Sequence, residues 1–388
     1  MRFERASPDV NKGGTAGVTL QSSCPFSYLL TEETRALLDS SADAKASSGR
    51  KDGNMKKAIV TKLIAAMVAV TTVLSMTACG SADADVKTIG VIQFTTVPSL
   101  DNCYTGFLKG LADEGFEDGK NIKIDFQNAN AEVSTADTQA QTMAQKKYDL
   151  VGAIATPAAM SAYGACKANG IPVVFTAVSD PVSAQLVESL DKSGTICTGS
   201  SDQLPLEAQV QMIRAFLPDA KKIGILYTTS EPNSITDLEK ISEIAPKYDF
   251  EIEAIGVTNS SEVATGAESL VAAGVDCINN FTDNNVVNNL PSVLQATTKA
   301  GIPVFGSEEG QVYDGCLASV SIDYVALGEE TGKIAGKILK GELKPEESKI
   351  YTASEGAPFV NTQVADSLGI KIPAEYEKST MVTTGSNK

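Results

Sequence analysis

The side chains best suited to chemistry in this chain are hydroxyls, amides and carboxylates that directly follow short apolar runs. These polar clusters occupy residues 95–99, 156–158, 176–181, 229–234, 282–284 and 307–309. Hydroxyls and the free N–H groups of helix N-termini suit a ligand carboxylate, and a buried Asp suits an ammonium group. The clusters therefore predict a binding site for a zwitterion that is held at both ends.

The predicted ligand contacts come from these clusters and from segments beside them. They are Thr96, Ser99, Thr156, Pro157, Ala177, Asp180, Asp202, Asn233, Ser234, Asp283, Asn284 and Asp323. Asp283 is the predicted partner of the ammonium group, because it follows an apolar run whose counterpart in the first half of the chain is followed by Thr156. The competing interpretation of each residue is helix capping, since Ser, Thr, Asp and Asn are the usual N-cap residues.

Composition excludes whole classes of chemistry. The chain has no His and no Trp, which rules out His-based acid/base catalysis, Ser-His-Asp triads and His-ligated zinc. No G-x-G-x-x-G follows the first apolar run of either half, and residues 328–334 lack the spacing of a phosphate loop. We therefore expect no metal and no cofactor, and these absences argue against an enzyme.

The net charge excludes one further class of partner. The chain carries 48 acidic and 32 basic side chains, a net charge of −16, without a basic cluster. Such a surface repels nucleic acid.

Besides Cys24 and Cys79, the cysteines at 103, 166, 197, 277 and 316 are odd in number and lack C-x-x-C spacing, so at least one of them is a free thiol.

A lipoprotein export signal is predicted ahead of the apolar runs. Residues 55–57 begin a basic segment, residues 63–74 form an apolar run too short to span a bilayer, and small residues lead to Cys79. We interpret 55–78 as a signal peptide, Cys79 as the lipidation site, 79–85 as a tether and 1–54 as an upstream extension outside the working protein. The competing interpretation is a buried helix that ends in Cys.

From residue 86 onward, β-branched apolar runs alternate with segments of helical period, as in parallel strands joined by crossover helices. The expected strands are 88–94, 122–126, 150–155, 172–175, 223–227, 250–256, 277–281 and 303–305, with helices at 101–113, 136–146, 206–216, 262–272 and 285–299. A strand at 317–321, a helix at 324–339, a strand at 349–352 and a helix at 362–368 follow.

This plan occurs twice, since residues 87–91 resemble 221–225 and residues 169–173 resemble 300–304 at nearly equal spacing. We therefore predict an α/β fold with two similar, doubly wound parallel-sheet lobes, formed by 86–202 plus 317–345 and by 203–316 plus 346–380. The alternative is a single larger sheet. The chain would cross between the lobes at least three times, with a hinge near 200–203 and 317–323.

A series of motifs at 127–129, 153–159, 171–181, 223–227, 231–234, 282–284 and 323–324 resembles one known family. It is the family of ABC-transporter substrate-binding proteins that are often described as tryptophan- or tyrosine-binding or as uncharacterised. The resemblance covers nearly all of residues 86–373 and implies a type I periplasmic-binding-protein fold without catalysis. By this similarity, Thr156, Ala177, Asn233 and Ser234 would hold the ligand carboxylate, and Asp283 would hold the ammonium group.

The resemblance implies a solute-binding lipoprotein, anchored by lipid outside the cytoplasmic membrane, that captures an amino acid, an aromatic one being the first candidate. The implied partners are the permease and ATPase subunits of an ABC importer. The alternatives are a sugar-binding or sensory protein of the same fold, or an enzyme on a doubly wound sheet. Family members commonly carry His before the Pro of the first cluster. Here Val97 stands there, a departure consistent with a different ligand side chain.

Overall fold

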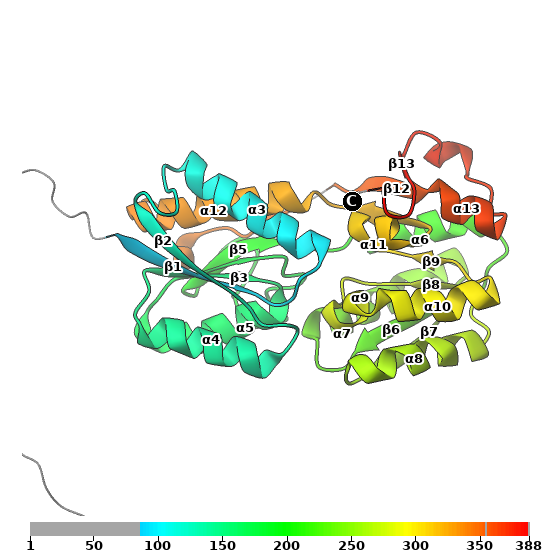
Figure 1. Cartoon of the computed structure of the whole chain (residues 1–388), viewed down its shortest axis with the longest axis horizontal. Coiled ribbons are helices and arrows are strands. Elements are labelled where there is room, and N and C mark those ends of the chain that lie inside the picture. Colours follow the sequence, from blue (N-terminus) through cyan, green and yellow to red (C-terminus); the bar gives the residue numbers. More distant parts are fainter. Residues whose placement is uncertain (1–85, 354, 387–388) are drawn as a thin grey trace, which may run out of the picture. The chain divides into compact units, whose positions relative to one another are not determined.

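The computed structural model describes residues 86–353 and 355–386 (Figure 1). The predicted upstream extension (1–54), signal peptide (55–78), lipidation site Cys79 and tether (79–85) lie outside the described residues. The described chain forms two α/β lobes on separate sheets, and the alternative of a single larger sheet is therefore wrong.

The first lobe is built on a six-stranded parallel sheet in the order β11-β5-β4-β3-β1-β2. Its strands are β1 (Lys87–Gln93), β2 (Ile122–Asn128), β3 (Leu150–Ile154), β4 (Val173–Thr176), β5 (Cys197–Ser201) and β11 (Tyr351–Thr352). Helices α3 (Pro98–Asp113) and α12 (Tyr324–Lys340) cover one face, and α4 (Val133–Gln145) and α5 (Thr156–Cys166) cover the other (Figure 1). Every residue of β3 and β4 is buried, as in strands covered on both faces.

The second lobe contains a parallel sheet in the order β7-β6-β8-β9 and a three-stranded sheet in the order β10-β12-β13. The strands are β6 (Lys222–Thr228), β7 (Glu251–Val257), β8 (Cys277–Asn279), β9 (Val304–Phe305), β10 (Ala318–Ser321), β12 (Ala357–Asn361) and β13 (Thr380–Val382). The helices are α6 (Leu206–Phe216), α7 (Pro232–Ile244), α8 (Ser260–Ala272), α9 (Asn284–Asn288), α10 (Leu290–Ala300), α11 (Glu309–Asp314) and α13 (Thr362–Leu368).

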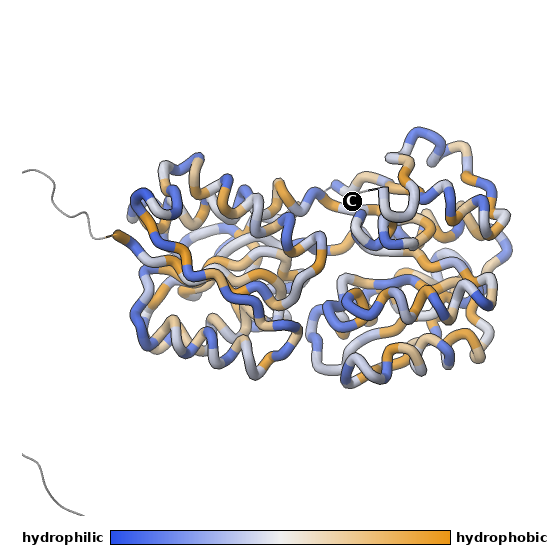
Figure 2. Tube along the Cα trace, viewed as in Figure 1, coloured by the Kyte–Doolittle hydropathy of each residue, from blue (hydrophilic) through white to orange (hydrophobic). Residues whose placement is uncertain are grey.

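Alternation of side chains along β6 gives the second lobe a core on each face of its parallel sheet. Ile225 belongs to one buried cluster and Leu226 to another, because successive side chains of a strand point to opposite faces. Figure 2 shows the hydrophobic residues concentrated along the strands and the polar ones along the outer turns and helix faces. This burial, rather than helix propensity, holds the helices on the sheets.

Most predicted elements are confirmed, and the exceptions have physical reasons. Strand β5 is not expected from its sequence, since its Thr, Gly and Ser residues do not form an apolar run. The helix expected at 285–299 is divided into α9 and α10, with a proline in the first turn of α10.

The predicted lobe boundaries are wrong at two segments. Strand β10 pairs with β12, so residues 317–321 belong to the second lobe, and β11 pairs with β5, so residues 351–352 belong to the first. Both segments are short strands whose partners are distant in sequence, which periodicity alone does not reveal. The chain passes between the lobes after β5, after β10 and after β11.

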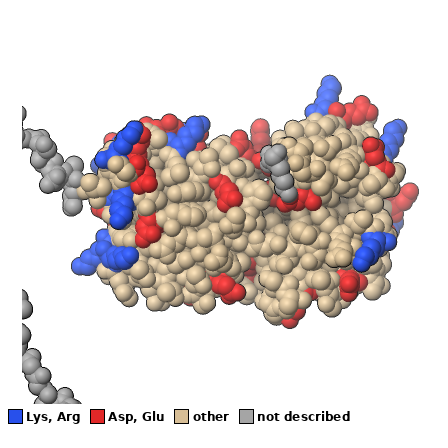
Figure 3. All heavy atoms as spheres, in the orientation of Figure 1, with Lys and Arg blue, Asp and Glu red and all other residues tan. Residues whose placement is uncertain are grey.

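Charge on the described surface is spread unevenly. On the face drawn in Figure 3, basic side chains lie toward the two ends, and the middle carries acidic and uncharged ones. Within residues 86–353 and 355–386, no helix combines the length and the apolar character needed to cross a bilayer.

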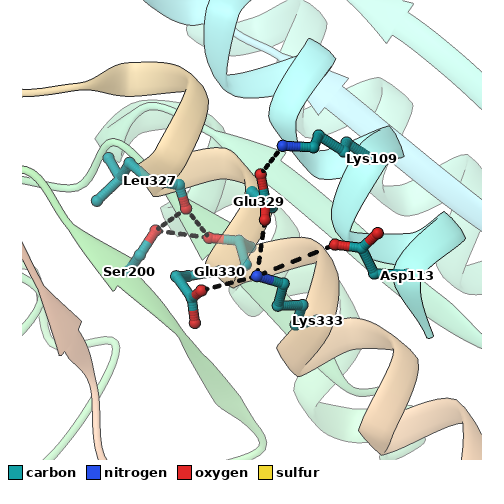
Figure 4. Close-up of polar contacts among 8 residues, drawn as sticks. Lys109, Asp113, Ser200, Leu327, Glu329, Glu330 and Lys333 are labelled. Atoms are coloured by element: carbon teal, nitrogen blue, oxygen red, sulfur yellow. Dashed lines mark hydrogen bonds and ion pairs between the residues drawn. The ribbon is translucent and has the colours of Figure 1, made fainter.

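Helix α12 returns to the first lobe by packing closely along α3. A Cβ on Gly110 would collide with the backbone of Glu329, so the two helices approach at glycines. Around this contact, Glu329 forms ion pairs with Lys109 at 2.5 Å and with Lys333 at 2.7 Å (Figure 4). Ser200 of β5 donates a hydrogen bond to the backbone oxygen of Leu327 in α12. Exposed ion pairs contribute little, so the backbone approach is the main constraint.

We expect Gly110→Ala to destabilise the protein by about 2 kcal/mol or more, because the added methyl group forces α3 and α12 apart. Gly164→Ala is the matched control. Gly164 also lies in a helix, but a Cβ there meets nothing within 4 Å, so the change should be neutral or stabilising by up to about 1 kcal/mol. Urea denaturation of both variants measures the difference, and equal stabilities would contradict this account of the packing.

Candidate ligand-binding site

A cavity lies between the lobes at the carboxyl ends of their parallel strands. The space that it leaves for the centres of water molecules is about 20 Å³, so the cavity is narrow in this structure. The first lobe contributes Val97, Ser99, Leu100, Ala155, Thr156, Ala177, Ser179, Asp202 and Tyr324, and the second contributes Asn233, Thr282, Asn284, Val287, Glu308 and Gln311.

Three helices begin at this cavity without a side-chain cap. They are α3, α5 and α7, whose N-cap residues Val97, Ala155 and Glu231 make no capping hydrogen bond to the helix they precede. Their first N–H groups therefore remain available, and the helix dipoles add partial positive charge. This arrangement favours a negatively charged ligand group at these helix ends.

Two residues of the cavity wall hold unusual backbone conformations. Ala155 has φ of 83° and Ala177 has φ of 55°, a region that residues with a Cβ rarely adopt. Both follow strands of the first lobe and both line the cavity. Such conformations cost of order 1–3 kcal/mol each and occur preferentially at functional sites.

Two buried carboxylates line the cavity, while none of its lining residues is Lys or Arg. Among the described residues, Asp202 accepts hydrogen bonds from Ser179 Oγ at 3.2 Å and from Tyr324 Oη at 3.3 Å, and burial raises its pKa to about 6. Glu308 accepts the N–H groups of Gly310 at 2.6 Å and Gln311 at 2.8 Å, and burial raises its pKa to about 7. Each carboxylate would be stabilised by a donor or cation in the cavity.

Two further polar atoms in the wall lack protein partners. The Oδ1 atom of Asn233 and the Oγ1 atom of Thr282 are buried without a hydrogen bond within the described part of the chain. Buried polar atoms are normally paired. Because both residues belong to the lining, these atoms are candidate partners for a bound ligand.

Polar contacts join the lobes beside the cavity. Lys240 of α7 pairs with Asp180 of the first lobe at 3.1 Å. Asn288, at the end of α9, donates to Thr95 Oγ1 of the first lobe at 2.7 Å. These contacts must break before the lobes can separate.

Part of the predicted site lines the cavity. The predicted contacts that do so are Ser99, Thr156, Ala177, Asp202, Asn233 and Asn284, and those that do not are Thr96, Pro157, Asp180, Ser234, Asp283 and Asp323. Thr96 is exposed and accepts Asn128 Nδ2 at 3.0 Å, Asp180 pairs with Lys240, and Asp323 caps α12. Pro157 lies in the first turn of α5, where its missing N–H is harmless.

The prediction that Asp283 holds an ammonium group is not supported. Asp283 is fully buried and lies outside the cavity lining. Its carboxylate accepts four hydrogen bonds. The donors are Thr228 N at 2.6 Å, Thr228 Oγ1 at 2.8 Å, Ser234 Oγ at 2.7 Å and Val286 N at 2.9 Å. These bonds cap α9 and fix it to β6 and α7, so capping is the better interpretation.

Other cavity residues are absent from the predicted contacts. Glu308 follows β9 in the polar cluster 307–309 and could have been chosen by the same rule that selected Asp283. Tyr324 and Val287 lie inside helical patterns that give no sign of a binding role. The described cysteines are all free and buried, as expected for small apolar packing residues.

These features define a two-lobed ligand-binding protein with a type I periplasmic-binding-protein fold. Residues 88–383 match the family described as ABC transporter substrate binding protein, and the chain belongs to this family. A tyrosine-binding protein of Clostridioides difficile is 42% identical over 256 residues, which are 66% of this chain and 73% of that protein.

Two solved structures are also similar. A Streptococcus pneumoniae ABC domain in complex with L-Trp is 37% identical with a TM-score of 0.73, over 76% of this chain and 99% of that one. A ligand-free, open substrate-binding protein with adhesive properties from Clostridium difficile is 40% identical with a TM-score of 0.60, over 77% of this chain and 100% of that one.

We expect Asp283→Ala to destabilise the protein by about 3 kcal/mol or more, because several buried donors lose their acceptor. Asp323→Ala is the matched control, since Asp323 also caps a helix but is exposed, and it should cost only about 1 kcal/mol. Urea denaturation separates the two. An Asp283→Ala variant with native stability and lost ligand binding would restore the ammonium role.

Proposed function

We propose that this protein captures a free amino acid as a zwitterion between its lobes. In this proposal the ligand carboxylate lies at the uncapped N-termini of α5 and α7, near Thr156 and Asn233. The ammonium group pairs with Asp202. The observation that carries the proposal is one cavity with uncapped helix ends and a poorly bonded, buried carboxylate.

Asp202 is suited to an ammonium group by what surrounds it. A buried negative charge needs a partner, and its two protein hydrogen bonds are long and come from neutral hydroxyls. An ammonium group supplies positive charge and three donors. Asp202 also directly follows β5, where the chain crosses to the second lobe, so a ligand bound there would contact the hinge.

The relatives support an aromatic amino acid as the ligand. One is a tyrosine-binding protein and another was solved with L-Trp. The TM-score is higher to the Trp complex than to the open, ligand-free relative, although the latter is slightly more identical. This likeness favours a closing movement of the lobes about a captured ligand.

The alternatives have less support. A sugar site usually places the ring between aromatic side chains, and Tyr324 is the only aromatic side chain that the described residues contribute to this lining. A sensory protein of the same fold would bind the same ligand without a transporter. Neighbouring genes for a permease and an ATPase would favour import over sensing.

We further propose that the protein serves an ABC importer outside the cytoplasmic membrane, where a lipid on Cys79 holds it. Family membership supports the transporter partners. The basic segment, the short apolar run and Cys79 support the anchor. Two acyl chains suffice for stable membrane binding, whereas one does not.

Cys79→Ser should release the protein from the membrane fraction without changing ligand affinity, because Cys79 precedes the described lobes. Cys24→Ser is the matched control, since it lies in the extension that we interpret as absent from the working protein. Fractionation with acyl labelling measures both. A Cys79→Ser variant that stays membrane-bound and labelled would refute the anchor.

Asp202→Asn should weaken amino-acid binding by about 30-fold or more, as expected for removing one partner of a buried charge pair. The pKa of Asp202 is about 6 before the ligand binds. A bound ammonium group favours the ionised form, so binding releases a proton at low pH. The wild-type affinity should therefore fall as the pH drops below about 6, by up to about tenfold per pH unit.

Calorimetry of L-Trp and L-Tyr between pH 5 and pH 8 tests both effects. Asp202→Asn should lose the component of pH dependence centred near pH 6, whereas Asp323→Asn, outside the cavity, should keep it. If Asp202→Asn binds as tightly as the wild-type protein, the ammonium group pairs elsewhere.

A further inference from the structure

The cavity has two ends of different character. At one end, the starts of α5 and α7 and the residue Asp202 present N–H groups and a carboxylate. At the other end, α3 and the segment that precedes it face α9 and α11, as the contacts Thr95–Asn288 at 2.7 Å and Asn102–Glu309 at 3.4 Å indicate. A ligand backbone held at the first end directs its side chain toward the second.

The second end combines an aliphatic wall with polar side chains, namely Ser99, Asn284, Gln311 and one carboxylate. Val97 and Leu100 from α3 and Val287 from α9 give an aliphatic wall, and Glu308 lies before α11 in the same lining. Glu308 is 1% exposed. An aromatic side chain would bury its ring against the aliphatic residues and bring its edge toward Glu308.

The hydrogen bonds of Glu308 leave acceptor capacity unused. One oxygen accepts the N–H of Gly310 at 2.6 Å and the other accepts that of Gln311 at 2.8 Å. A carboxylate has about four acceptor positions, so about two remain. An apolar group beside these positions would leave them without a hydrogen-bond donor, which is unfavourable for a buried carboxylate.

We propose that Glu308 accepts a hydrogen bond from a donor at the end of the ligand side chain. The site thereby selects amino acids with a phenolic hydroxyl or an indole N–H over those with a purely hydrocarbon side chain. This inference rests on the proposed function, because it requires the amino-acid backbone to lie at the other end of the cavity. It assigns side-chain specificity to one residue of the second lobe.

A buried acceptor without a donor discriminates strongly between ligands that carry a hydrogen-bond donor and ligands that lack one. A site built to bond a hydroxyl or N–H rejects the analogue that lacks it, since its own polar group is left unpaired. We therefore expect L-Phe to bind at least about tenfold more weakly than whichever of L-Tyr and L-Trp binds better. The methylated analogue of that ligand, O-methyl-tyrosine or 1-methyl-tryptophan, should also bind weakly.

Calorimetry with these ligands on the wild-type protein, Glu308→Ala and Glu309→Gln tests the inference. Glu308→Ala should reduce the preference over L-Phe to within about threefold. Glu309→Gln, the adjacent half-buried carboxylate outside the lining, should keep the preference. The preference is the ratio of two affinities measured on the same variant. The wild-type protein with all of these ligands therefore tests the preference even if Glu308→Ala fails to fold.

Several outcomes would overturn the inference while leaving the proposed function intact. They are equal wild-type affinity for L-Phe, tighter binding of an aliphatic amino acid, or a preference that Glu308→Ala leaves unchanged. A uniform loss of affinity for all ligands in Glu308→Ala would mean that Glu308 attracts the ammonium group instead. If no amino acid binds the wild-type protein, the proposed function itself fails.

Discussion

Negative charge buried between the lobes is the constraint on which this structure depends. Asp202 and Glu308 face one cavity, and no basic side chain of the described residues lines it. Burying such charges without a partner is costly, and burial raises the pKa of both groups. A cationic or donor ligand removes much of this cost only when both lobes surround it, which couples binding to closure.

The fold supplies the complementary positive end without any basic residue. Parallel strands direct all their carboxyl ends to one edge, and the helices that follow begin there. Helices α9, α11 and α12 are capped by their own acidic residues, whereas α3, α5 and α7 are not. The uncapped ends thus provide N–H groups for an anion, and the unusual conformations of Ala155 and Ala177 shape the wall between them.

The sequence predicts much of this arrangement, because hydrophobic periodicity and strand-end polarity are local properties. It gives the two-lobed α/β plan and several cavity residues, among them Thr156, Asp202 and Asn233. It fails for Asp283, since a strand-end Asp before a helix fits both a cap and a ligand contact. Only the fold brings Thr228 and Ser234 to its carboxylate. The pairings of β10 with β12 and of β11 with β5 cannot be recognised from local patterns either, because the partners are distant in sequence.

A crystal structure of the protein grown with L-Trp or L-Tyr is the most direct test of zwitterion capture in this cavity. We predict the ligand ammonium nitrogen about 3 Å from a carboxylate oxygen of Asp202, and the ligand carboxylate at the first N–H groups of α5. A ligand whose ammonium group contacts Asp283, or one bound outside the space between the lobes, would contradict the account.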